Sequence, residues 1–182
     1  DIQKTAIDGV VLITPRRFSD ARGYFVESYN AGRFRKAGIA DIFVQDNNYM
    51  SIAAGNVRGL HFQAPPRAQA KLVRVIKGAI VDIAVDARKS SPTYGKHVRA
   101  MLSAGNGAEL FIPAGFLHGF ATLEPETEVA YKVTDYYSAE HDGGVFWNDP
   151  ALAIDWGIDP AKAVVSGKDA KATRFGDFAS PF

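Results

Sequence analysis

The segment Ile80-Val81-Asp82-Ile83-Ala84-Val85-Asp86 has the clearest periodicity in this chain. Its odd-numbered β-branched residues alternate with its two aspartates at a period of two, which is the repeat of a β-strand. The preceding segment, Lys71–Ile76, is also of β type and ends at Lys77-Gly78, which predicts a hairpin turn between two paired strands. This stretch therefore predicts that strands dominate the fold.

Short β-type runs recur along the rest of the chain about ten residues apart, separated by Gly, Pro and Asn. They lie at 10–14, 23–28, 42–49, 57–62, 98–102, 109–112, 118–123 and 128–133. This spacing is typical of an all-β jelly roll or barrel rather than an α/β sheet. We expect a helix at Asn30–Ala37, capped by Asn30 and ended by Gly38, and one more turn after Asp159-Pro160. No repeat or linker interrupts the chain, so residues 1–182 are expected to form one domain.

Composition narrows the class of protein. Charged residues make up 23% and the net charge is +1 without a basic block, so we expect neither a nucleic-acid nor a membrane partner. Cysteine is absent, which excludes disulfides and cysteine nucleophiles. There is no apolar run long enough for a membrane span, and the first residues do not have the pattern of a signal peptide. A cytoplasmic location is therefore expected.

Three polar side chains fall on apolar strand faces. Strand parity places Lys71 and Tyr131 on such faces, and it places His61 on the face of Val57. A bulge reverses parity, and Gly59 is the expected place for one. A single buried histidine is usually a hydrogen-bonded core residue. An unpaired buried polar group costs roughly 1–3 kcal/mol, so three of them inside one barrel predict partners or a polar ligand.

The histidine spacing argues against a metal site. Metal-binding barrels of the cupin type usually present two histidines one residue apart, then a carboxylate and a later third histidine. His61 has no such neighbour, and no carboxylate lies between Gln63 and Asp82. The other three histidines are scattered, whereas a catalytic metal usually needs three nitrogen or oxygen ligands. We therefore expect no metal and no cofactor.

Nine segments, taken together and in order, resemble one family. They are Phe18–Glu27, Val44–Asn47, Val57–Gln63, Gln69–Val73, Asp82–Gly95, Ile112–Phe120, Tyr131–Tyr137, Trp147–Pro150 and Ser166–Asp169. Arg-Gly-Leu-His at 58–61 and Pro-x-Gly-Phe-x-His-Gly-Phe at 113–120 are specific in combination. The chain resembles the dTDP-4-dehydrorhamnose 3,5-epimerases, which act on dTDP-4-dehydro-6-deoxy-glucose in dTDP-L-rhamnose synthesis. The resemblance implies a metal-free, cupin-like jelly-roll homodimer.

The resemblance also implies catalytic roles. A ketone at C4 acidifies the hydrogens on C3 and C5, so inversion needs a base on one ring face and an acid on the other. His61 stands at the position of the family's base, and Asp169 at that of the residue orienting it. Tyr131 occupies the acid position, and Lys71 that of the lysine near the developing enolate oxygen.

Substrate contacts are implied in the same way. Arg22 and Arg58 are similar to diphosphate contacts, and Tyr137 to the aromatic residue that stacks on thymine. Asp142 stands where the family commonly has a glutamate, which puts its substrate contact in doubt. Further nucleotide or sugar contacts are implied at Glu27, Gln45, Asn47, His118 and Lys168.

Two other functions fit the same barrel. One is a mono-epimerase that inverts only C3 or only C5 of another dTDP-4-keto-6-deoxy sugar. The other is a non-catalytic sugar-nucleotide binder, against which the presence of both His61 and Tyr131 argues. In the family, an N-terminal strand crosses to the neighbouring subunit and lends residues to its site. Here such a strand is followed by Arg22 and Glu27, so a homodimer is expected.

Overall fold

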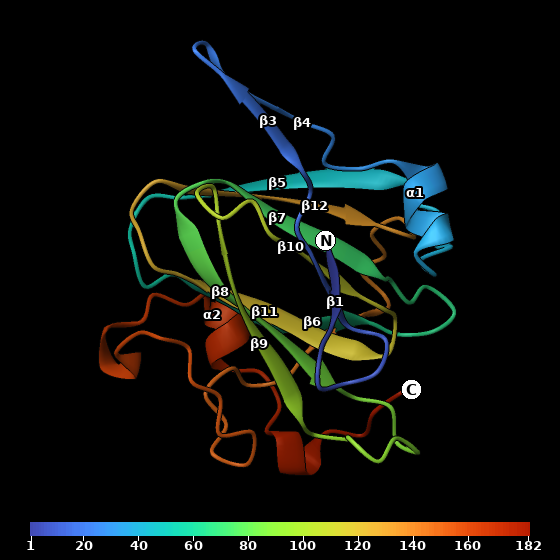
Figure 1. Cartoon of the computed structure of the whole chain (residues 1–182). Helices are drawn as coiled ribbons and strands as arrows, with labels where there is room; N and C mark the ends of the chain where they lie inside the picture. The colour runs from blue at the N-terminus through green and yellow to red at the C-terminus, as the bar shows by residue number, and fades with distance from the viewer.

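The computed structural model describes residues 1–182, and most of its strands lie in two antiparallel sheets that face each other (Figure 1). The six-stranded sheet has the order β1 (Ile2–Lys4), β2 (Val11–Ile13), β10 (Glu109–Ile112), β7 (Lys71–Lys77), β12 (Thr127–Val133) and β5 (Gln45–Ser51). The five-stranded sheet has the order β13 (Asp142–Gly144), β6 (Val57–Gln63), β11 (Phe116–Thr122), β8 (Ala79–Asp86) and β9 (His97–Ser103). This is a jelly roll, one of the two architectures that the strand spacing predicted, and it has the cupin-like form that the family resemblance implied.

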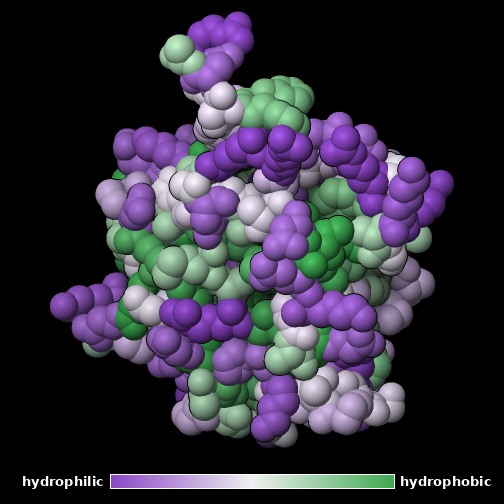
Figure 2. All heavy atoms as spheres, in the orientation of Figure 1, coloured by the Kyte–Doolittle hydropathy of each residue, from purple (hydrophilic) through white to green (hydrophobic).

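A separate two-stranded arm is formed by β3 (Arg17–Asp20) and β4 (Gly23–Val26), which pair only with each other. The arm stands clear of the globular body at the top of Figures 1 and 2. Phe18, Tyr24 and Phe25 on this arm are all more than half exposed. Exposed aromatic side chains on a protruding element are typical of a surface that a partner covers.

Helices are few and short, as expected. Helix α1 spans Ala31–Lys36; the side chain of Asn30 accepts a hydrogen bond from the N–H of Arg33, and Gly38 follows with a φ of +90°. The turn after Asp159 is the 3-10 helix Pro160–Lys162. The strands β1, β3 and β13, the helix α2 (Gly167–Ala170) and the 3-10 helix Phe175–Asp177 were not predicted. No helix has the length and apolar character needed to cross a lipid bilayer.

The predicted hairpin at Lys77-Gly78 is wrong. Strands β7 and β8 lie in different sheets, so the turn between them is a corner of the sandwich and not a pairing turn. Strand β7 pairs instead with β10 and β12, and β8 with β9 and β11. Turn residues show that the chain reverses direction, but they do not show which strand becomes the neighbour.

Strand β8 is buried on both faces, which the alternating pattern alone did not predict. Ile80 and Ala84 pack in the core between the two sheets. The intervening residues Val81, Ile83 and Val85 pack in a second core, which the C-terminal segment covers with Trp147, Leu152 and Trp156. Asp82 has the parity of Ile80 and Ala84, so its side chain faces the interior between the sheets and is fully buried.

A bulge in β6 decides which way His61 points. The pairing of β6 with β11 shifts register between His118 and Phe120, at Gly59 on the facing strand. Val57 and Leu60, three residues apart, consequently pack in the same outer core. Simple parity, which put His61 on the face of Val57, is therefore wrong. The bulge anticipated at Gly59 is present, and it turns His61 towards the interior.

We predict that Gly59→Ala destabilises the protein by about 3 kcal/mol, because it adds strain and steric overlap at one buried point. Gly59 has a φ of +135°, and a Cβ there would lie 2.5 Å from the Cα of Gly119. Chemical denaturation measures the free energy of unfolding. Gly176→Ala is the matched control, because its Cβ would meet nothing within 4 Å. Equal stability of the two variants would contradict this account of the bulge.

Candidate active site

The interior between the sheets contains a cavity of 270 Å³, which side chains from both sheets line. The predicted site residues that line it are Gln45, Asn47, His61, Lys71, Tyr131, Tyr137 and Asp142. A second hollow of 330 Å³ shares His61 and Tyr49 with the cavity and adds Arg58, Lys168 and Asp169. The two hollows thus meet at His61, with the jelly roll supplying residues far apart in the sequence.

His61 is held by a carboxylate from the C-terminal segment. Its Nε2 lies 2.6 Å from Oδ1 of Asp169, which belongs to α2. The hydroxyl of Ser166 caps this helix by accepting a hydrogen bond from the N–H of Asp169. The N–H of Gly59 approaches the second carboxylate oxygen at 3.4 Å. The bulge that turns His61 inward therefore also helps to hold the residue that orients it.

The charge state of Asp169 fixes the tautomer of His61. Burial alone would raise the pKa of Asp169, but hydrogen bonds from His61, Gly59 and Ser166 more than offset it and lower the pKa below its usual range. An ionised carboxylate can only accept hydrogen bonds, so Nε2 of His61 carries the proton. The ring's lone pair is then on Nδ1, which makes Nδ1 its basic atom.

Tyr131 comes from the opposite sheet. Its ring stacks on Tyr49, with centroids 5.6 Å apart and an interplanar angle of 23°. Arg58 lies 4.4 Å from the centroid of the Tyr49 ring. Burial, followed by the hydrogen bond with Tyr49, raises the pKa of Tyr131 above its usual range. Tyr131 is therefore a protonated phenol at neutral pH, which is the state of a proton donor. Tyr49 was missed from the sequence, since aromatic residues are common in strands.

Lys71 also lines this cavity, and the pKa of its ammonium group is lowered. Burial lowers the pKa of its ammonium group to about 8, while Asp82 and Asp142 act in the opposite direction. At neutral pH most of the Lys71 population is charged, so the cavity contains a cation beside His61 and Tyr131.

A second histidine–aspartate pair lies beside the first. His118 on β11 is paired in register with His61, and its Nε2 lies 2.7 Å from Oδ1 of the buried Asp82. Burial lowers the pKa of His118, Lys71 and His61 lower it further, and Asp82 opposes them. Asp82 was not among the predicted site residues. The signal for it was an aspartate within the most strongly apolar strand of the chain.

The outer end of the cavity is polar and open. Lys168 forms an ion pair with Asp142, and the hydroxyl of Tyr137 donates to the same carboxylate at 3.5 Å. Gln45 accepts a hydrogen bond from the N–H of Tyr137 and donates one to Asn47. The side chain of Tyr137 remains 63% exposed, so its ring is free to stack on a ligand.

Two predicted contacts lie away from the cavity of this chain. Arg22 is in the turn of the arm and pairs only with Asp20. Glu27, just after the arm, forms an ion pair with Arg33 of α1 at 3.2 Å. A single chain therefore does not bring Arg22 and Glu27 to the other predicted site residues.

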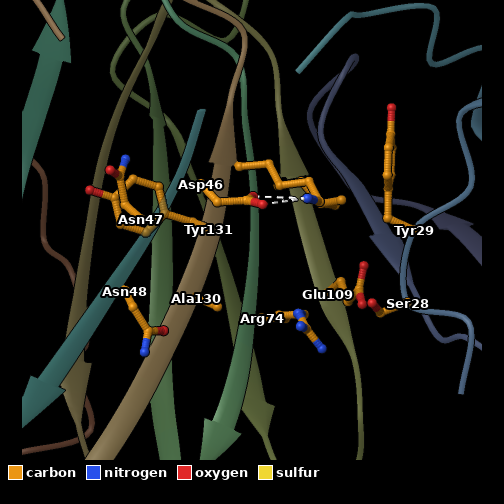
Figure 3. Close-up of a pocket in the computed structure, with 11 residues that line it drawn as sticks. Ser28, Tyr29, Asp46, Asn47, Asn48, Arg74, Glu109, Ala130 and Tyr131 are labelled. Carbon is orange, nitrogen blue, oxygen red and sulfur yellow. Dashed lines mark hydrogen bonds and ion pairs between the residues drawn. The ribbon is translucent and has the colours of Figure 1, made fainter. Parts of the chain in front are cut away.

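A third hollow of 260 Å³ lies largely on the outer face of the six-stranded sheet (Figure 3). Figure 3 shows Tyr131 and Asn47 on one side of β12, and Glu109 and Arg74 on the other. Burial raises the pKa of Glu109 to about 8, against the opposing charges of Arg74 and Lys132. This hollow is separated by the sheet from His61 and Lys71, which do not line it.

Comparison with known proteins identifies the same family that the sequence motifs indicated. Residues 4–177 match the sequence profile of the dTDP-4-dehydrorhamnose 3,5-epimerase family. A relative of that name from Sinorhizobium fredii is 56% identical over 155 residues, covering 85% of this chain and 79% of the relative.

Solved structures agree in fold and length. The dTDP-4-dehydrorhamnose 3,5-epimerase of Bacillus anthracis, with TDP and PPi bound, is 47% identical at a TM-score of 0.93 and covers 96% of this chain and 98% of its own. The dTDP-6-deoxy-D-glucose-3,5-epimerase of Legionella pneumophila, in complex with dTDP-4-keto-L-rhamnose, is 43% identical at a TM-score of 0.91, with 96% and 92% coverage.

These matches place the chain in the class of cupin-like jelly-roll isomerases. The chain belongs to the dTDP-4-dehydrorhamnose 3,5-epimerase family.

We predict that His118 is neutral at pH 7 and carries its proton on Nε2, because burial disfavours the imidazolium and Asp82 accepts from Nε2. Long-range ¹H–¹⁵N NMR of the histidine rings reports both the tautomer and the titration midpoint. His118→Gln assigns the resonance. An imidazolium spectrum for His118 at pH 7 would refute this description of the pair.

Proposed function

We propose that this protein inverts C3 and C5 of dTDP-4-dehydro-6-deoxy-D-glucose, giving dTDP-4-dehydro-L-rhamnose. Membership of the 3,5-epimerase family supports the substrate class. The single observation that carries the mechanism is the placement of His61 and Tyr131. They come from opposite sheets and line one cavity, the first held by a carboxylate and the second protonated.

The chemistry follows from this placement. The ketone at C4 lets a proton leave C3 or C5, because the resulting negative charge is delocalised onto the ketone oxygen. Nδ1 of His61 takes the proton on one ring face, and Tyr131 returns a proton on the other face. Lys71 lies where a cation stabilises the enolate oxygen. Proton removal and return leave no net change in redox state, so the proposed reaction needs no redox cofactor, and the positive charge at the enolate oxygen is supplied by Lys71.

The polar end of the cavity suits the nucleotide. Tyr137 provides an exposed ring for thymine, and Arg58 and Lys168 provide cations for the diphosphate. Gln45 and Asn47 extend the polar lining next to Tyr137, while His118 lies beside His61 at the sugar end. Asp142, being paired with Lys168, orients that lysine whether or not it touches the substrate.

We propose that the active form is a cytoplasmic homodimer, each subunit being one domain of residues 1–182. The arm supports this proposal, because it extends away from its own body and exposes Phe18, Tyr24 and Phe25. Arg22 and Glu27 lie on or beside the arm, far from the cavity of their own chain. A second copy that receives the arm would gain both residues for its site.

Substitution of the acid and the base separates their roles. His61→Ala should lose epimerisation and solvent exchange at C3 and C5 by at least about 10²-fold, the usual contribution of a positioned base. Tyr131→Phe should still incorporate deuterium from heavy water with little net inversion, because only the donor hydroxyl is removed. Asp169→Asn should fall between them. NMR of the substrate in deuterated water measures exchange and inversion separately at each carbon.

Controls define what these outcomes mean. His97→Ala and Tyr94→Phe change the same residue types outside the cavity and should leave activity unchanged. Binding of dTDP should survive all three active-site changes. Wild-type exchange at both carbons in His61→Ala would overturn the assignment of the base. Exchange at only one carbon in the wild-type protein would identify a mono-epimerase, and no exchange at all would favour a binding protein.

Subunit mixing tests whether the arm acts across a dimer. Arg22→Ala and His61→Ala should each be weakly active alone. If Arg22 serves the partner's cavity, a mixed dimer carries both defects in one site and leaves the other intact. Random mixing should then restore about a quarter of wild-type activity, as expected for a two-fold dimer. Light scattering checks the mass, and no recovery in a confirmed dimer would contradict exchange of the arm.

A further inference from the structure

Asp82 is a buried carboxylate with spare hydrogen-bonding capacity beside the proposed reaction centre. It is 0% exposed, and its Oδ1 lies 2.7 Å from Nε2 of His118. Its Oδ2 is buried and has no hydrogen-bond partner. An unpaired buried carboxylate oxygen is costly unless a nearby positive charge compensates it. A positive charge on this side of Asp82 would therefore be stabilised by the carboxylate.

Lys71 on β7 lies in the opposite sheet and shares a strand face with Val73, which packs in the same interior core as Ile80 and Ala84 on the Asp82 face of β8. Two carboxylates act on its ammonium group, Asp82 on β8 and Asp142 on β13. Asp142 is already ion-paired with Lys168 and accepts from Tyr137. Asp82 has no ion pair with a lysine or arginine, so it is the carboxylate with charge left to balance Lys71.

We propose that Asp82 is a positioning residue whose carboxylate is the fixed counter-charge of Lys71, keeping that side chain an ammonium ion inside the cavity. The inference rests on the proposed function, in which Lys71 stabilises the enolate oxygen. A neutral amine at that place would supply little of this stabilisation. Asp82 acts through Lys71 and does not need to touch the substrate.

The other titratable groups around Lys71 do not replace Asp82. The titratable groups that line the cavity around Lys71 are Tyr49, His61, Tyr131, Tyr137 and Asp142. Asp82 and His118 interact with its charge from the five-stranded sheet. Neutral His118 and protonated Tyr131 carry no charge at pH 7, and a protonated His61 would repel the ammonium group. Removing the charge of Asp82 therefore leaves only Asp142 to oppose burial, and the pKa of Lys71 falls below its present value of about 8.

Asp82→Asn isolates the charge, because the amide oxygen still accepts a hydrogen bond from His118. In ¹³C-lysine-labelled protein, the Cε resonance of Lys71, assigned with Lys71→Arg, should titrate at least about one pH unit lower than in the wild type. The ratio of wild-type to variant kcat should be near one at pH 6 and reach about five at pH 8, since Lys71 loses its proton earlier in the variant. A purely structural role would lower kcat by a similar factor at every pH.

Asp86→Asn is the matched control. Asp86 lies on the same strand, is equally buried, and is bound by Arg88, Ser91 and Thr93 at the far end of β8. This change should reduce stability but leave the titration of Lys71 and the shape of the pH profile unchanged.

Each outcome decides the proposal. An unaltered Lys71 titration in folded Asp82→Asn would overturn it, as would an equal shift in Asp86→Asn. Should Asp82→Asn fail to fold, the double change Asp82→Asn with Lys71→Met tests the pair from the other side. Removing both charges should restore folding that removing the carboxylate alone abolishes, and a double variant that also failed to fold would overturn the proposal. If the wild type did not epimerise the sugar nucleotide, the proposed function would fail, while the lysine titration would still decide the counter-charge.

Discussion

The close approach of β6 and β11 at Gly59 and Gly119 is the constraint on which the cavity depends. A Cβ at Gly119 would lie 2.8 Å from the carbonyl oxygen of Arg58 and 3.2 Å from Trp156, so neither strand has room for a side chain here. The extra residue in β6 reverses the side chains that follow it, which sends Leu60 into the outer core and His61 into the interior. The backbone of Gly59 also reaches the carboxylate that holds His61. One local irregularity thus positions the proposed base and supports its orienting partner.

Burial then acts in one direction on three titratable groups in one small space. It lowers the pKa of Lys71 and His118 and raises that of Tyr131, in each case favouring the neutral form. Asp169 is the exception, since its hydrogen bonds outweigh burial and keep it ionised. Burial therefore keeps Tyr131 protonated, as a proton donor must be, and it brings the pKa of Lys71 down to about 8. It also explains why the cavity tolerates two histidine–aspartate pairs side by side: the buried His118 is held neutral and does not add a charge.

The surface of the barrel shows that one chain does not bring every predicted site residue to its own cavity. Three apolar clusters pack the body of the chain, and no residue of the arm of β3 and β4 belongs to any of them. The aromatic side chains of the arm are exposed, and Arg22 at its turn pairs only with Asp20 and does not line the cavity of its own chain. If two copies exchange arms, one contact between the subunits covers the exposed aromatic side chains and also completes both sites. The hollow on the outer face of the six-stranded sheet is lined by a buried carboxyl group, that of Glu109.

The sequence by itself determined the strand-rich class, most strand positions, both predicted caps and the family, because period-two patterns, turn residues and contiguous motifs are local. Parity also placed Lys71 and Tyr131 inward. The tertiary structure alone decided the neighbours of each strand, the inward turn of His61 and the environment of Asp82. The alternation at 80–86 located a strand, but it could not show that the odd-numbered apolar residues face an outer core and Asp82 the interior. The pair of Asp82 with His118 joins residues 36 positions apart, and only folding brings them together and removes the water that would otherwise screen them.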